Sequence, residues 1–253
     1  MILLIRILPL CVAALEAALF WWQTQMPGSY PWIVVAGVAL LPLAALAISW
    51  KQVRLWDLME KMAPTFLLIL SLGFALLLVE GVWPTRILIA LAAAATFLSL
   101  EVLFLLARHP TAYPVHGISR VNISYVPLTV WYAFSTSIGM IIFLQTDRLW
   151  HIVMSAVLGV LIFRTTGHPG ATKEQNRVWM MVGGIVGLET GLLGLLLPVS
   201  MAVQGLIAVL LICGALRARR YLHDPKPSRR TAFIEGGALI VLLATTLVTA
   251  KWI

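Results

Sequence analysis

Long apolar runs separated by short polar segments fill this chain. A helix needs about 20 mostly apolar residues to cross the hydrocarbon core of a bilayer. The pattern therefore predicts an all-α fold, a polytopic transmembrane helical bundle of about nine spans in one integral membrane domain, residues 1–253. The run 149–164 is short, and Pro198 leaves one long bent helix open as an alternative to two spans. The predicted spans are 2–22, 31–50, 63–83, 86–107, 124–145, 149–164, 178–197, 199–216 and 231–251.

The basic residues between these runs predict the orientation of the chain. Lysine and arginine are enriched in cytoplasmic loops, and this bias directs insertion. With a cytoplasmic amino terminus, three loop bases lie outside: Arg86, Arg148 and Lys251. We expect this orientation, an outer carboxyl terminus and a place in the plasma or inner membrane. The fourteen bases then inside are Lys51, Arg54, Lys61, Arg108, Arg120, Arg164, Lys173, Arg177, Arg217, Arg219, Arg220, Lys226, Arg229 and Arg230.

The connections between the runs are short on the predicted outer side and longer on the inner side. This alternation predicts four helical hairpins, 1–50, 63–107, 124–164 and 178–216, and a final single helix. Three inner loops begin with similar triplets, which suggests a repeated hairpin. Such triplets also suit the end of any helix, because a cation meets the negative end of the helix dipole and proline cannot continue the helix. The triplets are Arg108-His109-Pro110, Gly167-His168-Pro169 and His223-Asp224-Pro225.

The composition indicates that lipid is the main solvent of this chain. Hydrophobic residues make up 61% of the sequence and charged residues 11%, whereas about 25% are charged in an ordinary soluble domain. The net charge of +8 belongs to the orienting loops, and no basic face with interleaved aromatic residues predicts nucleic-acid binding. We expect no cofactor. Four of the five histidines fall in predicted loops, with His151 at an outer helix end, and no spacing fits haem or zinc.

Glu189 is the most costly side chain of the predicted bundle. It falls midway along the run 178–197, and a carboxylate inside the hydrocarbon costs about 3 kcal/mol. Four glycines occupy an arc of about 80° on the opposite face of this helix, and such small residues let two helices approach closely. Glu189 is interpreted as a link to another helix or as a proton, cation or substrate site. The helix-packing ridge is Gly183, Gly187, Gly191 and Gly194.

Polar side chains also recur on one face of the run 124–145. Their spacing of three and four residues predicts a polar stripe along one helix. Lipid would not satisfy so many polar groups, so we expect the stripe to face the bundle interior, as contacts between helices or as the lining of a pathway. The polar stripe consists of Asn122, Tyr125, Thr129, Tyr132 and Thr136, and Gly139 continues it.

Glu16 lies part-way into the first run, on a face with near-heptad spacing. That spacing is typical of a contact between helices. We expect the Glu16 carboxyl group to pack inside the bundle against a hydroxyl or an indole. The other residues of this face are Pro9, Ala13, Phe20 and Gln23.

Two features bear on enzymatic function. The inner loop 108–120 could contact a lipid phosphate, or it could be an interfacial anchor. The stretch from Gly187 to Ser200 resembles the glutamate-rich segment of undecaprenyl pyrophosphate phosphatases, which are polytopic membrane enzymes. The second carboxylate of that segment and its Pro-Gly-x-Ser-Arg-Ser partner are missing, so the resemblance implies no activity. The candidate phosphate contacts of the loop are Arg108, His109, His116 and Arg120.

Three functions follow as hypotheses. The first is a transport or channel-type protein, whose solute or proton path lies between the polar stripe and Glu189. The second is a non-catalytic subunit or scaffold of a larger membrane complex, with other membrane subunits or further copies of the chain as partners. The third is a membrane-embedded enzyme that acts on a lipid-linked substrate, which is disfavoured because no catalytic cluster is present.

Overall fold

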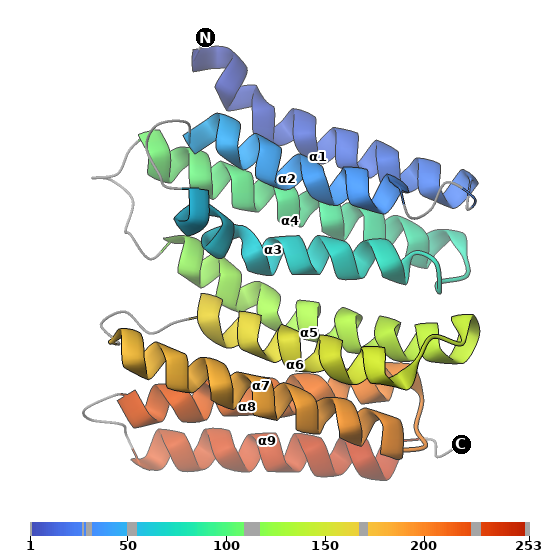
Figure 1. Ribbon diagram of the computed structural model, residues 1–253, viewed down its shortest axis with the longest axis vertical. Helices are drawn as coiled ribbons and strands as arrows, with labels where there is room; N and C mark the ends of the chain where they lie inside the picture. Colours follow the sequence, from blue (N-terminus) through green and yellow to red (C-terminus); the bar gives the residue numbers. More distant parts are fainter. Residues whose placement is uncertain are drawn as a thin grey trace. The chain divides into compact units, whose positions relative to one another are not determined.

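Nine α-helices make up the described part of the computed structural model, which comprises residues 2–26, 28, 32–49, 55–108, 117–166, 172–223 and 229–250. These ranges contain no β-strand, and the all-α prediction is confirmed (Figure 1). The helices are α1 (Ile2–Gln25), α2 (Trp32–Ser49), α3 (Leu55–Ala75), α4 (Val82–Arg108), α5 (Gly117–Leu144), α6 (Arg148–Thr165), α7 (Lys173–Leu196), α8 (Met201–His223) and α9 (Arg229–Thr249).

Seven of the described helices are long and apolar enough to cross a bilayer. The other two, α3 and α9, have shorter apolar segments, Met62–Ala75 and Phe233–Thr249. A full crossing takes about 20 residues. Nine spans were predicted, and the structure describes nine helices. By length and composition, seven of these described helices could each cross a membrane.

Two predicted boundaries fall at turns. Helix α7 ends at Leu196 and α8 begins at Met201, so the chain forms two helices around Pro198, which cannot donate a backbone hydrogen bond. The predicted span 63–83 is wrong at its end, because α3 stops at Ala75 and a turn follows. Gly81 has a φ of 105° in this connection, a conformation that a residue without a Cβ adopts at little cost.

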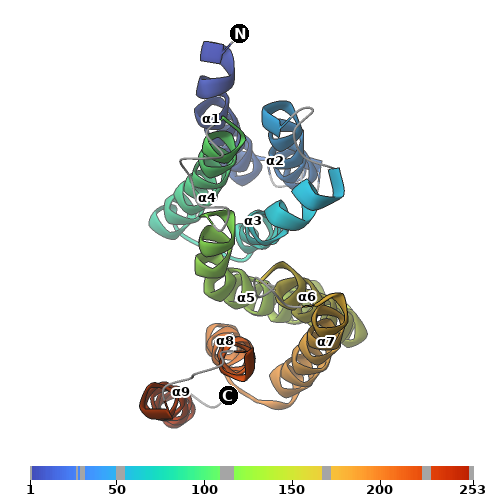
Figure 2. The same cartoon turned by 90° about the vertical axis from the view of Figure 1, so that its left-hand side faces the viewer.

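The chain forms two compact units, Met1–Tyr125 and Val126–Ile253, and each is described by itself. In the first unit, α1 packs against α2 and α4, and α3 also packs against α2 and α4 (Figure 2). Phe20 of α1 is fully buried. A Cβ on Gly37 of α2 would lie 3.0 Å from the Phe20 ring, and a Cβ on Gly73 of α3 would lie 3.4 Å from it. Glycines on two helices thus make room for one aromatic ring.

In the second unit, the backbones of α6 and α7 are in direct contact. A Cβ on Gly159 of α6 would lie less than 3.0 Å from the Gly183 carbonyl oxygen of α7. A Cβ on Gly187 would likewise lie less than 3.0 Å from the carbonyl oxygen of Ser155. Glycine residues let these helices approach closely, which increases van der Waals contact where lipid supplies no hydrophobic driving force.

Helix α8 packs against α5 through Gly205. A Cβ on this glycine would lie less than 3.0 Å from Ser135 and from the backbone oxygen of Trp131. The Trp131 indole nitrogen donates a hydrogen bond of 3.1 Å to the Ala202 carbonyl oxygen. Gly205 therefore lets α8 approach the α5 backbone at Trp131, whose side chain is hydrogen-bonded to the α8 backbone.

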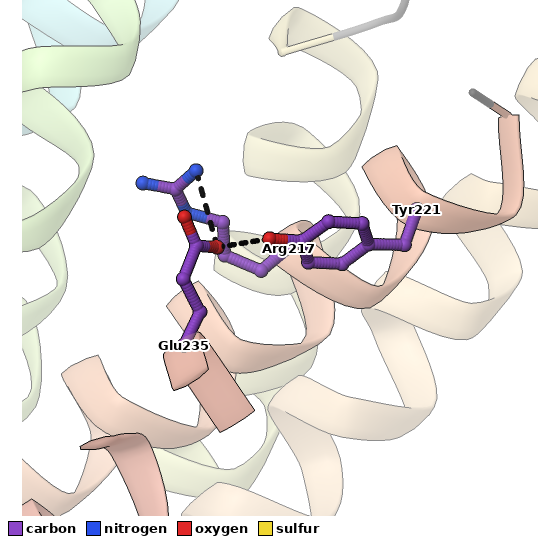
Figure 3. A network of polar contacts seen from close by, with 3 residues as sticks. All are labelled: Arg217, Tyr221 and Glu235. Carbon is purple, nitrogen blue, oxygen red and sulfur yellow. Dashed lines mark hydrogen bonds and ion pairs between the residues drawn. The ribbon is translucent and has the colours of Figure 1, made fainter. Parts of the chain in front are cut away.

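Helices α8 and α9 are joined by a small polar network (Figure 3). The Tyr221 hydroxyl donates a 2.5 Å hydrogen bond to the Glu235 carboxylate. The same carboxylate forms an ion pair with Arg217 at 3.5 Å, and both side chains are partly exposed. Toward the other end of this helix pair, Ile207 of α8 packs with Val199 and Ala250. A polar network and an apolar cluster thus hold α9 against α8.

Replacing Tyr221 by phenylalanine should destabilise the protein only slightly. The change removes one hydrogen bond, and the remaining Arg217 to Glu235 pair is partly exposed and screened. We expect a loss of less than about 1 kcal/mol in the free energy of unfolding. Denaturant unfolding in detergent micelles measures this loss of free energy. A loss of several kcal/mol would show that the packing of α9 on α8 depends mainly on this network.

Arg219 of α8 links the last turn of α6 to the first turn of α7. Arg219 is 3% exposed and lies inside α8, which continues to His223, so the prediction that Arg219 belongs to a loop is wrong. The guanidinium donates to the Phe163 carbonyl oxygen in the last turn of α6 at 2.6 Å and to the Asn176 side chain of α7 at 2.9 Å. It also lies 5.6 Å from the centre of the Trp179 ring. The guanidinium donates to a carbonyl oxygen at the end of α6 that has no partner within the helix. Its positive charge also interacts favourably with the negative end of the helix dipole.

Candidate functional site

The polar stripe of α5 is mostly buried in the structure. Thr129 and Thr136 are buried in the second unit, and Tyr132 is half-buried there. Asn122 and Tyr125 are buried in the first unit. These five positions therefore lie largely away from the lipid-facing surface.

His151 of α6 brings a titratable side chain to the interior of the second unit. It lies one turn into α6, whose amino end is capped by the Asp147 side chain through a 2.9 Å hydrogen bond from the Leu149 amide. The imidazole is 1% exposed, and its Nδ1 atom forms a 2.6 Å hydrogen bond with the Ser137 hydroxyl of α5. The Phe134 ring meets the imidazole edge-on at 5.8 Å. A hydroxyl and an aromatic ring of α5 thus hold the histidine in one orientation.

Gln204 of α8 lies beside the same place. Its side-chain nitrogen donates to the carbonyl oxygens of Leu197 and Val199, each at 3.0 Å. These carbonyls belong to the connection between α7 and α8, so the amide ties this connection to the first turn of α8. A Cβ on Gly194 of α7 would lie 3.4 Å from His151 Nε2 and 3.8 Å from Gln204 Oε1. The two polar side chains therefore meet next to a glycine.

Glu189 lies on a different side of α7 from the packing glycines. Gly183, Gly187 and Gly191 are buried, whereas the Glu189 side chain is exposed. Helix α7 begins at Lys173, five residues before the predicted span, because Thr172 and Gln175 form a capping box at its start. Glu189 consequently lies in the last third of α7.

The first unit contains a buried carboxyl group. Glu16 is 0% exposed and accepts a hydrogen bond from the Thr96 hydroxyl of α4. On the same face of α1, the Gln23 side chain donates to the Gly73 carbonyl oxygen at 3.1 Å. The prediction that Glu16 packs inside the bundle against a hydroxyl is confirmed. A second buried polar pair lies between α3 and α4, where the Thr65 and Ser99 hydroxyls are 2.8 Å apart.

The predicted lipid-phosphate contacts fall largely outside the residues that the structure describes. Arg108 is exposed at the end of α4. His109 and His116 lie outside the described residues, and Arg120 lies in α5 with a side chain that is not described. Among the described residues, no group of three His, Cys, Asp or Glu side chains could hold a metal ion.

His151 and Gln204 are the residues that sequence reasoning missed. His151 was expected at an outer helix end, but it is followed at intervals of four by Ser155 and Gly159. Residues at this spacing share one helix face, and a polar, small-residue face suits packing against another helix in a membrane. The spacing could have identified the buried face of α6, whereas nothing in the sequence pairs His151 with Gln204.

The described helices and their composition establish the general class of this protein. No protein family matches the chain, and no curated protein and no solved structure matches it. Its length and its seven long apolar helices make it a multi-pass α-helical membrane protein.

Proposed function

We propose that this chain is a transport or channel-type membrane protein that conducts protons through its second unit. The observation that carries the proposal is His151, a titratable side chain that is 1% exposed and bonded to a neutral hydroxyl. Ionisable groups inside membrane spans are costly and commonly mark ion or proton pathways. Histidine can take up and release a proton near neutral pH.

The polar stripe supplies further groups along the proposed path. Thr129, Tyr132 and Thr136 precede Ser137 on α5, so hydroxyl groups recur along the helix that contacts His151. Glu189 is proposed as the second titratable group of the pathway. Its carboxylate lies on α7, the helix whose Gly194 adjoins His151, but on the exposed side of that helix. The proposal thus keeps the predicted solute path and adds the histidine to it.

Proton flux into liposomes tests this proposal. The purified protein is reconstituted with an internal pH-sensitive dye, and a potassium gradient with valinomycin supplies the driving potential. We expect flux in the wild type and a loss of about tenfold or more in His151→Gln, because a positioned proton carrier typically accelerates transfer by about 100-fold or more. Glu189→Gln should also lower the rate.

Glu174→Gln is the matched control for this experiment. Glu174 is exposed in the first turn of α7, and the substitution removes the same charge from the same helix. Its flux should equal that of the wild type. Equal flux in wild type, His151→Gln and Glu189→Gln, for protons and for every other solute tested, would refute the transport proposal.

A second candidate function, a subunit of a larger membrane complex, is favoured by the exposed side of α7. Glu189 lies there among exposed apolar residues, including Ile185, Leu188 and Leu192. Lipid cannot hydrogen-bond a carboxyl group, so a transmembrane partner that carries a donor would stabilise this face. Co-purification from native membranes with a stoichiometric partner that Glu189→Gln releases would support this function. A monomer in native membranes would exclude it.

A further inference from the structure

Two buried polar atoms of the second unit lack hydrogen bonds at the same place. His151 Nε2 and Gln204 Oε1 are both buried, and neither has a hydrogen-bond partner among the described atoms. Their residues are 1% and 8% exposed. Leaving a buried polar group unsatisfied costs about 1 to 3 kcal/mol. One molecule that hydrogen-bonds to both atoms would remove both of these free-energy costs.

The hydrogen bonds of Gln204 determine which way its amide group faces. The side-chain nitrogen donates to two carbonyl oxygens, Leu197 and Val199. The opposite assignment would place a carbonyl oxygen against two other carbonyl oxygens, which cannot form a hydrogen bond. Oε1 is therefore the atom directed toward Gly194, where it can accept a hydrogen bond.

The imidazole has one free nitrogen for the same reason. Nδ1 is occupied by the Ser137 hydroxyl at 2.6 Å, which leaves Nε2 facing α7. The backbone of Gly191 also approaches the ring, so a direct bond from the imidazole to the Gly191 carbonyl oxygen is the alternative to a bridging molecule. Nε2 can accept or donate, depending on which nitrogen carries the proton. Its partner must therefore be able to do either.

Gly194 leaves open the place where these atoms meet. A Cβ at this position would lie 3.4 Å from His151 Nε2, 3.7 Å from Ile138 Cδ1 and 3.8 Å from Gln204 Oε1. Each of these is an ordinary van der Waals distance. The absence of a side chain on α7 thus provides room beside both unpaired atoms.

We propose that one water molecule binds beside Gly194 and bridges His151 Nε2 to Gln204 Oε1. Buried waters typically make about three hydrogen bonds to otherwise unsatisfied groups. Water can donate to Gln204 and either accept from or donate to the imidazole, so it suits both tautomers. The water site itself does not depend on the proposed function. Its use as a proton relay from Ser137 through His151 rests on that function.

Nuclear magnetic resonance of protein labelled with ¹⁵N-histidine in lipid bilayers tests the site directly. The His151 signal is assigned by its loss in His151→Gln. We expect magnetisation transfer from water to Nε2 in the wild type and its loss in Gly194→Ala, whose methyl group occupies the space beside both polar atoms. Gly214→Ala is the control, because its Cβ would lie 3.7 Å from Leu239 in the same unit. It should keep the wild-type signal.

The outcomes separate the water site from the transport function. Absence of water transfer to Nε2 in the wild type, with a shift typical of a direct bond to the Gly191 carbonyl, would overturn the site. Water transfer without proton flux would support the site and refute the proposed function. Flux that depends on His151 but is equal in Gly194→Ala and wild type would overturn the relay. The relay would be supported if Gly194→Ala loses both the water transfer to Nε2 and the proton flux, and if Gly194→Ser recovers the flux.

Discussion

Replacing Gly187 by alanine is expected to destabilise the second unit by about 2 to 3 kcal/mol, the upper part of the usual range for overpacking. The added Cβ would lie less than 3.0 Å from the Ser155 carbonyl oxygen. That oxygen is part of the α6 backbone, so no side-chain rotation can relieve the clash. The two helices must separate, and the contacts at Gly159 and Gly183 would then loosen as well.

Thermal and denaturant unfolding in detergent micelles measure this effect. Gly236→Ala is the control, because nothing lies within 4 Å of a Cβ at that position in α9. Alanine is a better helix former than glycine by up to about 1 kcal/mol, so the control should be unchanged or more stable. Gly187→Ala is therefore expected to lose stability, whereas Gly236→Ala is not. Equal stability of Gly187→Ala and Gly236→Ala would contradict the close packing of α6 on α7.

Replacing Arg219 by methionine should cost about 2 to 4 kcal/mol of unfolding free energy. The substitution keeps much of the apolar stem but removes the donors to Phe163 and Asn176. It also removes the cation that faces the Trp179 ring. Removing one partner leaves buried acceptors unsatisfied, which is more costly than the net value of the hydrogen bonds.

Arg220→Met provides the matched control for Arg219. Arg220 is the next residue of α8 and is exposed, so the same change removes a charge without removing a buried contact. We expect its stability to stay within about 0.5 kcal/mol of the wild type. Denaturant unfolding of both variants, with proteolysis near the α6 to α7 connection, distinguishes the two positions. Similar stability in both variants would show that Arg219 is not the link between the three helices.

Much of the architecture could be predicted from the hydrophobic pattern. The apolar runs identify the nine helices, and Pro198 marks the break between α7 and α8. The face of Glu16 was also predictable, because its spacing lies within a single helix. The end of α3 was not, since residues 76–79 remain apolar although the helix has ended and the chain turns there. Hydropathy reports burial in lipid, and it does not distinguish a helix from an apolar turn.

The candidate site was less predictable than the fold. The stripe on α5 and the glycines on α7 share faces through local spacing, which sequence reveals. Arg219 was expected in a loop and is buried, because the partners that bury it come from α6 and α7. His151 meets Ser137 and Gln204 through two other helices. No pattern within one helix contains that information.

The sequence by itself determined that this protein is helical and belongs in a membrane. Inside a bilayer, each backbone polar group must be satisfied locally, so long apolar runs specify helices without reference to their neighbours. Only the tertiary structure decided which polar side chains are buried together. His151, Gln204 and Gly194 come from three helices, and their meeting depends on how closely those helices approach. That approach depends on the shapes of facing side chains, above all on the glycines of α6 and α7.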